Sequence, residues 1–258
     1  MKNSFVIARK DLASYFHSWV GVLVFVFFFL LAGIFFSIVV ARYSEISLEA
    51  TKNTALSVEG IGLTRYVFGS LFLNLSMLLI FLVPLMTMKS FAEERKLQTL
   101  ELLFTYPLSD FEIVWGKFMA LVWFFELLFL PTAGYLLLIR WLGGSFDWGP
   151  VLTAYFGFWL LGNAYLSLGL FVSSLTENEV ASAIVTFSAF VIFWIFDWVA
   201  TVTEAPWSQI FTALSPLTHY REFTVGVLDL SHVVYFLFFH LYFLFLTLRS
   251  IETRNWKG

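Results

Sequence analysis

The chain has 258 residues, of which 60% are hydrophobic and only 13% are charged, and it contains no cysteine. A soluble globular domain is about half apolar and about a quarter charged, so this composition indicates a chain that is solvated partly by lipid. The net charge of −3 gives no basic surface of the kind that nucleic-acid binding needs. The lack of cysteine excludes disulfides, thiolate catalysis and cysteine-ligated metal sites.

The first segment, 3–18, has the pattern of an amphipathic helix. Its apolar face comprises Phe5, Ala8, Leu12, Tyr15, Phe16 and Trp19, and its polar face comprises Lys10, Asp11, Ser14, His17 and Ser18. Such a helix lies along the membrane interface. It is either a simple membrane anchor or an elbow helix that borders a docking groove for a partner. The elbow residues expected to matter are Phe5, Arg9, Lys10, Leu12 and Phe16.

Six apolar runs are each long enough to cross a bilayer, which takes about 20 residues. They cover 19–41, 67–88, 113–139, 151–175, 180–199 and 230–248. The first run follows basic residues, as in a signal peptide, but it is too long and no small-residue cleavage site follows it, so we expect it to be retained. The runs predict an all-α membrane protein with six transmembrane helices, forming one membrane domain over 1–258.

The distribution of Lys and Arg predicts the orientation. Six spans place both termini on the same side as the second and fourth connections, and that side carries ten of the fifteen Lys and Arg residues. The positive-inside rule therefore puts both termini in the cytoplasm. We expect the chain to lie in the inner membrane of a prokaryote. The sequence TENE at 176–179 predicts a tight polar turn between the fourth and fifth spans, because carboxylates are costly in hydrocarbon.

The most charged connection, 89–108, lies between the second and third spans. Its stretch FAEERKLQTLELLF is rich in helix-forming residues, and Pro107 ends the pattern. Ser109, with Glu112 three positions later, predicts a capping box that starts the third span. Charges of both signs accompanied by leucines suit a protein partner better than anionic lipid. We therefore expect a short helix at the cytoplasmic face.

The sequence EERKLQTLELLFTYPLSDFEIVWGK resembles the cytoplasmic segment of type-2 ABC exporter permeases. The matching residues are Glu94, Arg95, Thr99, Glu101, Leu102, Leu103, Pro107, Ser109, Gly116 and Lys117. Gln98 departs from that pattern, because the family usually has glycine there. The sequence ARKDLASYF is similar to the family's elbow, and 214–236 is similar to its segment before the last span. Within the family, the chain looks nearest to the gliding-motility and nitrous-oxide-reductase-maturation permeases.

This resemblance implies the permease subunit of an ATP-driven exporter, with 89–108 acting as a coupling helix in a cleft of a separate ATPase subunit. The chain has no G-x-x-x-x-G-K-[ST] sequence, so the partner would bind ATP and Mg²⁺, and we expect neither enzymatic activity nor a cofactor in this chain. The expected partners are an ATPase dimer, a second permease copy or a similar chain, and periplasmic or membrane accessory proteins.

The residues expected to couple the chain to the ATPase are Glu93, Glu94, Arg95, Leu97, Thr99, Leu100, Glu101 and Phe104. Of these, Glu94 and Arg95 would fix the register by ion pairing. Leu97, Leu100 and Phe104 would supply buried contact.

The polar residues inside the predicted spans include Glu126, Asn163 and His240. A carboxylate at the position of Glu126 must face protein or water. It either lines a pathway or dimer interface, or is protonated or hydrogen-bonded by a neighbour such as Asn163 or His240. The outer segment 200–229 is interrupted by two prolines and predicts re-entrant helices before the last span, which the resemblance implies form a lid over the exit.

Two other functions compete with the permease. An ion-coupled secondary carrier would use Glu126, although the chain lacks the repeated halves common in such carriers. An intramembrane hydrolase would need a metal site built from residues such as His219, Glu222, Asp229 and His232, for which no metalloprotease motif is present. A passive membrane scaffold is a third alternative.

Overall fold

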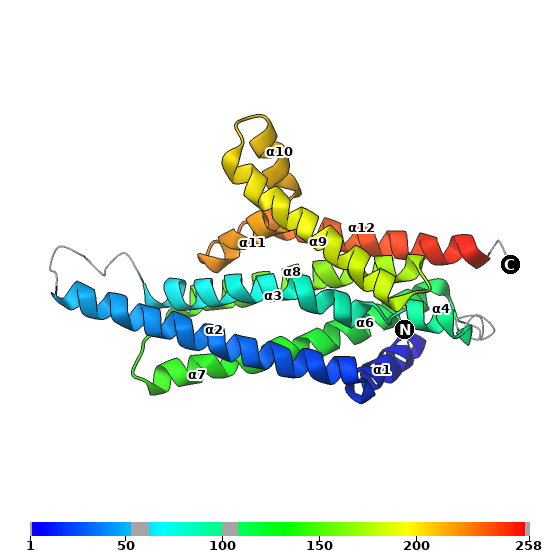
Figure 1. The fold of residues 1–258 in the computed structure, drawn as a ribbon, viewed down its shortest axis with the longest axis horizontal. Helices are drawn as coiled ribbons and strands as arrows, with labels where there is room; N and C mark the ends of the chain where they lie inside the picture. Colours follow the sequence, from blue (N-terminus) through cyan, green and yellow to red (C-terminus); the bar gives the residue numbers. More distant parts are fainter. Residues whose placement is uncertain (1, 53–61, 100–107, 256–258) are drawn as a thin grey trace.

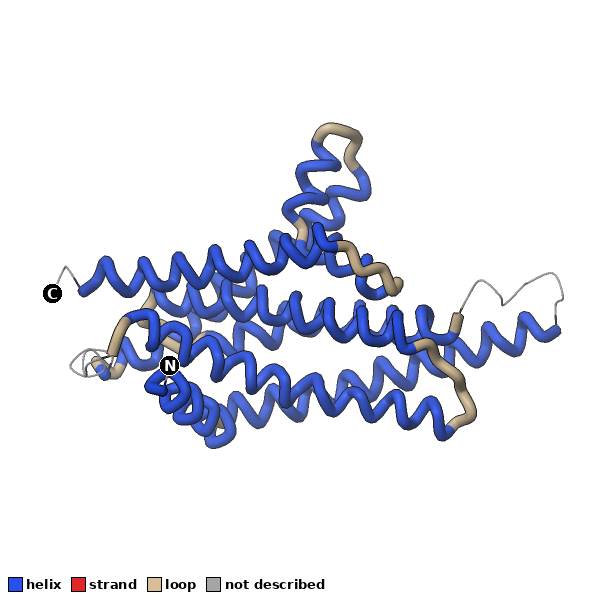
Figure 2. Tube along the Cα trace, turned by 180° about the vertical axis from the view of Figure 1, so that it is seen from behind, coloured by secondary structure: helices blue, strands red, loops and turns tan. Residues whose placement is uncertain are grey.

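The structure, a computed structural model, describes residues 2–52, 62–99 and 108–255. The regular elements in these residues are helical, and no strand occurs among them (Figures 1 and 2). In chain order the α-helices are α1 (Lys2–His17), α2 (Trp19–Lys52), α3 (Ser70–Thr87), α4 (Ala92–Lys96), α6 (Asp110–Phe129), α7 (Gly134–Trp141), α8 (Trp148–Leu175), α9 (Glu179–Val202), α10 (Trp207–Leu214), α11 (Pro216–Thr224) and α12 (Leu230–Asn255). The predicted all-α class is confirmed.

Six helical stretches within the described ranges are long and apolar enough to cross a membrane. They are Trp19–Glu49, Arg65–Lys96, Asp110–Trp141, Trp148–Leu175, Glu179–Val202 and Leu230–Thr253. Each contains one of the six predicted spans and is longer than the span predicted there. A helix satisfies its backbone hydrogen bonds within one segment, which is what a chain surrounded by lipid requires.

The third span differs from the single helix predicted over 113–139. Pro131 has no backbone N–H and its ring clashes with the preceding turn, so α6 ends at Phe129. A 3₁₀ turn, Leu130–Ala133, then leads into α7, which completes the span (Figure 1).

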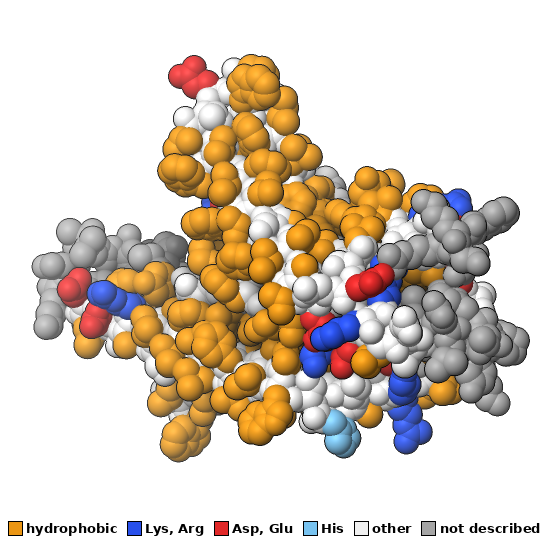
Figure 3. Space-filling view, turned by 45° about the vertical axis from the view of Figure 1, so that its right-hand side comes forward, with side chains coloured by type: hydrophobic (Ala, Val, Ile, Leu, Met, Phe, Trp, Pro, Cys, Tyr) orange, Lys and Arg blue, Asp and Glu red, His pale blue; other side chains and the backbone are white. Residues whose placement is uncertain are grey.

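Helix α8 forms the centre of the bundle. It is almost entirely buried and packs against α3, α6, α9, α11 and α12. Its small residues, including Ala154, Ala164 and Ser167, allow the close approach that is typical between membrane helices. In contrast, few residues of α9 and α12 are buried. Figure 3 shows apolar side chains over the middle of the molecule and charged side chains toward its ends, as expected for a bundle that lipid surrounds.

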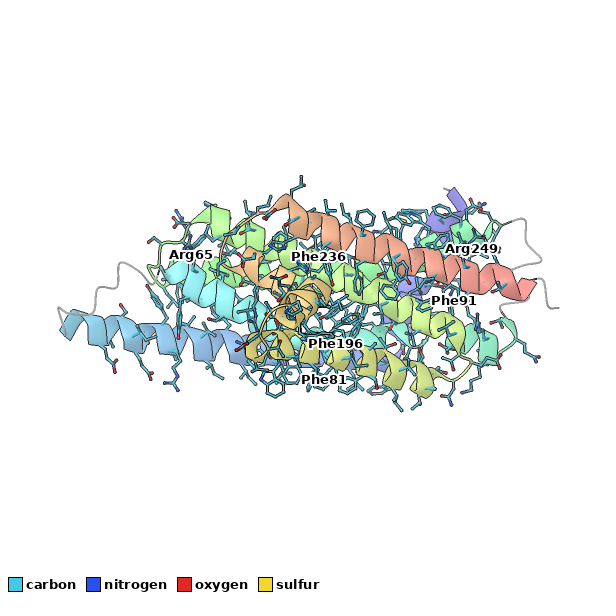
Figure 4. The ribbon with its side chains drawn as sticks, turned by 90° about the horizontal axis from the view of Figure 1, so that it is seen from above. Arg65, Phe81, Phe91, Phe196, Phe236 and Arg249 are labelled. Atoms are coloured by element: carbon cyan, nitrogen blue, oxygen red, sulfur yellow. The ribbon has the colours of Figure 1, made fainter. Side chains whose placement is uncertain are left out.

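Both chain termini lie at one end of the bundle, together with α4 and the turn between α8 and α9 (Figure 1). We call this end the terminal end, and we call the opposite half of the bundle, which includes α10 and α11, the distal end. In Figure 4, Phe91 and Arg249 mark the terminal half, whereas Arg65 marks the distal end. An even number of spans predicts this arrangement of the termini.

At the distal end, two short helices occupy the predicted re-entrant segment 200–229. Helix α10 packs against α9, and the two form a hairpin that projects from the side of the bundle (Figures 1 and 2). No residue of α10 is buried. Helix α11 begins at Pro216 and lies against α8. Entry of these helices into the outer leaflet, and a role as a lid, stay predictions.

Side chains of α11 connect it to both neighbouring spans. The buried carboxylate of Asp197, in α9, accepts hydrogen bonds from the Arg221 guanidinium at 2.7 Å and the Thr218 hydroxyl at 3.1 Å. The Nδ1 atoms of His219 and His232 lie 2.7 Å apart and join α11 to α12. These contacts hold α11 while leaving α10 outside the packed bundle.

Candidate functional site

Helix α4 is the described part of the segment in which the sequence predicts a coupling helix. It ends at Lys96, because Leu97 leaves the helical conformation and Gln98 takes a left-handed backbone with φ 57°. The prediction of one continuous helix through 91–104 is therefore wrong at Leu97 and Gln98. Glycine adopts a positive φ without steric cost, whereas a residue with a Cβ does not. Gln98 thus has the conformation that favours the glycine usual in the resembling family.

Ser173 of the central helix α8 holds the start of α4. Its hydroxyl accepts hydrogen bonds from the backbone N–H groups of Phe91 and Ala92, at 3.1 and 3.2 Å, and donates to the carbonyl of Met88 at 3.2 Å. Ser173, Phe91 and Ala92 are all buried. Since unpaired backbone groups are costly when buried, this serine fixes the backbone where α3 turns into α4.

A group of four charged side chains, Lys10, Asp11, Glu94 and Lys117, joins three helices. Its centre is the ammonium group of Lys117, in α6, whose side chain is only 2% exposed. This ammonium lies 2.8 Å from the Glu94 carboxylate of α4 and 3.1 Å from the Asp11 carboxylate of α1. It also lies 5.1 Å from the centre of the Phe91 ring. We call these four residues the Lys117 cluster. A buried ammonium needs such compensation, because its desolvation is expensive.

Lys10 closes the Lys117 cluster from the solvent side. Its ammonium lies 3.6 Å from Glu94 and 3.8 Å from Asp11, and its side chain is 66% exposed. Nearby, the Tyr15 hydroxyl is 3.1 Å from the Ser90 hydroxyl, which adds a second link between α1 and the region before α4. Burial raises the pKa of Tyr15 well above its ordinary value, so this tyrosine stays protonated at neutral pH.

The packing of α1 on α6 depends on Gly116. A Cβ atom at this position would lie 2.8 Å from the Ser4 carbonyl oxygen and 2.9 Å from the Ile7 Cβ, so only glycine fits without displacement. The resulting buried face of α1 contains Ser4 and Ala8. Gly116 therefore brings α1 close enough for Asp11 to reach Lys117.

This packing differs from the amphipathic pattern of the sequence. Asp11, expected on the polar face, turns inward to Lys117, whereas Phe5 and Phe16 are about half exposed. Phe5 still contacts Trp123, and Phe16 contacts Phe124. Leu12 packs on the core as a partly buried residue, and Arg9 and Lys10 are exposed. The role of α1 as an elbow at the membrane interface stays a prediction.

The turn between α8 and α9 lies beside α4, as two ion-pair distances of Glu179 show. Glu179 lies 3.9 Å from Lys89 and 3.8 Å from Lys96, and Lys89 lies 4.0 Å from Glu93. The Asn178 side chain caps α9 by accepting hydrogen bonds from two backbone N–H groups. The predicted tight polar turn at 176–179 is confirmed, and the capping box of Ser109 and Glu112 at the start of α6 is confirmed as well.

The predicted coupling residues divide into inward and outward groups. Glu94 faces the Lys117 cluster, and the buried Arg95 lines a groove between α4, α8 and α12. Leu97 is 61% exposed, Glu93 is partly exposed, and the Thr99 hydroxyl donates to the Glu94 carbonyl at 3.3 Å. Leu100, Glu101 and Phe104 lie outside the described residues.

A groove with a volume of about 540 Å³ opens between α1 and α4. Charged and polar side chains from both helices line it, and Leu97 forms one edge. The groove thus presents a mixed-charge surface with an apolar margin at the terminal end. Such a surface fits a protein segment rather than a small apolar ligand.

Two of the polar residues inside the spans, Glu126 and Asn163, form hydrogen bonds with Trp159. Its indole N–H donates to the Glu126 carboxylate at 3.2 Å, and its carbonyl accepts from the Asn163 amide at 2.8 Å. Glu126 is thus hydrogen-bonded by a neighbour, which was one of the predicted alternatives, but the neighbour is Trp159 rather than Asn163 or His240. His240 packs separately against the Phe118 ring.

The residues considered for a metal site do not converge. His219 and His232 are in contact, but the described part of the chain contains no group of three His, Cys, Asp or Glu residues that could hold a metal ion. Of the four residues considered, the structure therefore gathers only this histidine pair.

The six long apolar helices define a multi-pass membrane protein. A family model described as ABC-2 family transporter protein matches residues 5–251, nearly the whole chain. The chain therefore belongs to the ABC-2 transporter family, as a membrane-embedded permease component. Comparison with curated proteins gives no match.

Proposed function

We propose that this chain is the permease subunit of an ATP-driven exporter and receives the work of a separate ATPase subunit at its terminal end. Membership of the ABC-2 family supports association with an ABC ATPase. The observation that carries the proposal is the anchoring of α4. Ion pairs of Glu94 join α4 to α1 and α6, and an ion pair of Lys96 joins it to α9. The backbone N–H groups of Phe91 and Ala92 join it to α8 by hydrogen bonds. A partner that presses on α4 acts on four helices at once.

In this proposal the predicted coupling residues have two tasks. Leu97 and Glu93, with the neighbouring Lys96, offer exposed side chains to the ATPase, and the groove between α1 and α4 lies beside them. Glu94 and Arg95 point inward, so they hold α4 in place rather than touch the partner. The turn at 176–179 extends the same surface toward α9.

The remaining features of the proposal follow from the positive-inside distribution and the resemblance. Both termini and α4 face the cytoplasm of a prokaryotic cell, and the chain lies in the inner membrane as one permease domain. Two copies, or one copy with a similar chain, enclose the pathway, and periplasmic or membrane accessory proteins complete the assembly. Within the family, the proposal places the chain with the gliding-motility and nitrous-oxide-reductase-maturation permeases, on the resemblance of its sequence to them.

Co-purification tests this function. We expect the tagged chain, purified from its native membrane, to bring with it a P-loop subunit identifiable by mass spectrometry, together with ATPase activity. Leu97→Asp places a charge on the proposed contact surface, and we expect it to remove that subunit without lowering the yield or thermal stability of the permease. Val227→Asp is the matched control, because Val227 is also exposed but lies in the loop before α12, at the distal end.

Two outcomes contradict the proposal at different levels. If the unaltered chain brings no P-loop subunit, the permease is not part of an ATP-driven complex. If Leu97→Asp retains the subunit and its activity as well as Val227→Asp does, the docking surface lies elsewhere.

A further inference from the structure

The backbone alone does not connect motion of α4 to the third span. Helix α4 has five residues and ends at Lys96, and the chain then passes through the left-handed Gln98. Helix α6 starts afresh at its own cap, Ser109, whose backbone is extended with φ −79° and ψ 147°. The two helices are therefore not continuous, and a push on α4 has no straight helical path into α6.

A side-chain route is far shorter. The Glu94 carboxylate of α4 meets the Lys117 ammonium at 2.8 Å, and Lys117 lies about two turns inside α6, counted from Asp110 at 3.6 residues per turn. The contact thus enters α6 away from its first turn, where helices fray. Its burial matters, because separating the pair would leave the buried ammonium with only one of its two carboxylate partners.

We infer that Lys117 is a positioning residue that carries movement of α4 into the third span through its ion pair with Glu94. The inference rests on the proposed coupling to an ATPase. Asp11 holds the same ammonium from α1, and Gly116 permits the approach of α1 that this second contact requires. The adjacent glycine and lysine therefore have complementary tasks: one sets the helix spacing and the other joins the helices.

The two carboxylates around Lys117 provide a matched pair of variants. Glu94→Ala separates α4 from α6 but leaves Lys117 paired with Asp11. Asp11→Ala removes the other carboxylate and leaves the link between α4 and α6. Both side chains are 15% exposed, and both variants remove one negative charge from the same ammonium, so their effects on stability are comparable.

A fluorophore on a single cysteine reports the movement. The chain has no cysteine, and Leu127 lies on the exposed face of α6, so Leu127→Cys labelled with bimane senses a change in the surroundings of this helix. We expect the complex of permease and ATPase, in vesicles, to show an emission shift when ATP and vanadate trap the nucleotide. The shift should be lost in Glu94→Ala and retained in Asp11→Ala, with the ATPase still bound in both.

The outcomes separate this inference from the proposed function. A shift that persists in Glu94→Ala, or that is lost equally in both variants, overturns the role of the ion pair between Glu94 and Lys117 while leaving the coupling to an ATPase intact. Failure of the unaltered chain to bind a P-loop subunit overturns both. If Glu94→Ala does not accumulate, Glu94→Gln is used instead, because it removes the charge and keeps the shape, and the same loss of the shift is expected.

Discussion

The two ends of the bundle hold their short helices in different ways. At the terminal end, α4 is joined to four other helices, and the ammonium at the centre of the Lys117 cluster is shielded from water. At the distal end, α10 has no buried residue and packs mainly on α9 and α11. The charged contact there, between Asp197 and Arg221, has an arginine side chain that is 51% exposed.

This difference indicates a division of mechanical roles. Buried, mutually paired charges resist separation, so the terminal end is suited to transmit displacement to several spans at once. A projecting hairpin with few packed contacts can shift relative to the bundle at low cost in free energy. Movement applied at α4 would therefore be conveyed as a rigid displacement, whereas the distal hairpin would follow or rearrange.

Removing the Lys117 ammonium, at the centre of the Lys117 cluster, should have the largest effect on the free energy of unfolding. Lys117→Met removes the cation between two carboxylates and leaves them poorly solvated, which should cost about 3–5 kcal/mol in unfolding free energy. Lys10→Met is the control: Lys10 belongs to the same cluster but is 66% exposed, so its loss should cost less than about 1 kcal/mol. Unfolding of the two purified variants in mild detergent measures both. Equal losses would mean that burial of Lys117 does not govern the terminal end.

A second change tests the hydrogen bonds that hold α4 to the central helix. Ser173→Ala leaves the N–H groups of Phe91 and Ala92 without their acceptor, which should cost about 2 kcal/mol. Loosened α4 should also be cleaved faster by trypsin after the exposed Lys96. Ser174→Ala is the control, because that neighbouring hydroxyl donates only within its own helix, to the Phe171 carbonyl. Identical cleavage rates in the two variants would argue against anchoring by Ser173.

The corresponding change at the distal end should be milder. Asp197→Asn removes the ion pair with Arg221, but the partly exposed guanidinium can still be solvated and the amide oxygen can still accept from Thr218. We expect a loss of about 1 kcal/mol, well below that of Lys117→Met. Unfolding measured under the same detergent conditions compares them. A loss as large as that of Lys117→Met would remove the contrast between the two ends.

Features set by local chemistry could be predicted from the sequence. Apolar runs of sufficient length specify six spans whatever their neighbours are, and the capping box of Ser109 and Glu112 needs only residues three positions apart. The polar turn at 176–179 follows for the same reason. Pro131, which interrupts the third span, is also visible in the sequence, but the apolar residues on both sides of it favour the prediction of one continuous helix.

The interior of the candidate site depends on tertiary packing and could not be predicted in the same way. The helical pattern of α1 places Asp11 on a polar face, and only the approach of α6, permitted by Gly116, turns that face toward Lys117. Ser173 gives no local signal, because its partners are backbone groups of a distant turn. The sequence did contain one signal, the position of Lys117 shortly after the predicted span begins, because a lysine there requires a partner of opposite charge.

The smallest expected effect has the opposite sign and concerns the end of α4. Gln98→Gly relieves the left-handed backbone of φ 57°, and the gain should be about 0.5–1 kcal/mol after the greater chain entropy of glycine in the unfolded state is subtracted. Leu97→Gly is the control, because Leu97 has φ −87° and gains nothing from glycine, so it should be destabilised. Thermal unfolding compares the two variants. If Gln98→Gly also lowers stability, the Gln98 side chain contributes contacts that outweigh its backbone strain, and the terminal end is held by more than the Lys117 cluster and Ser173.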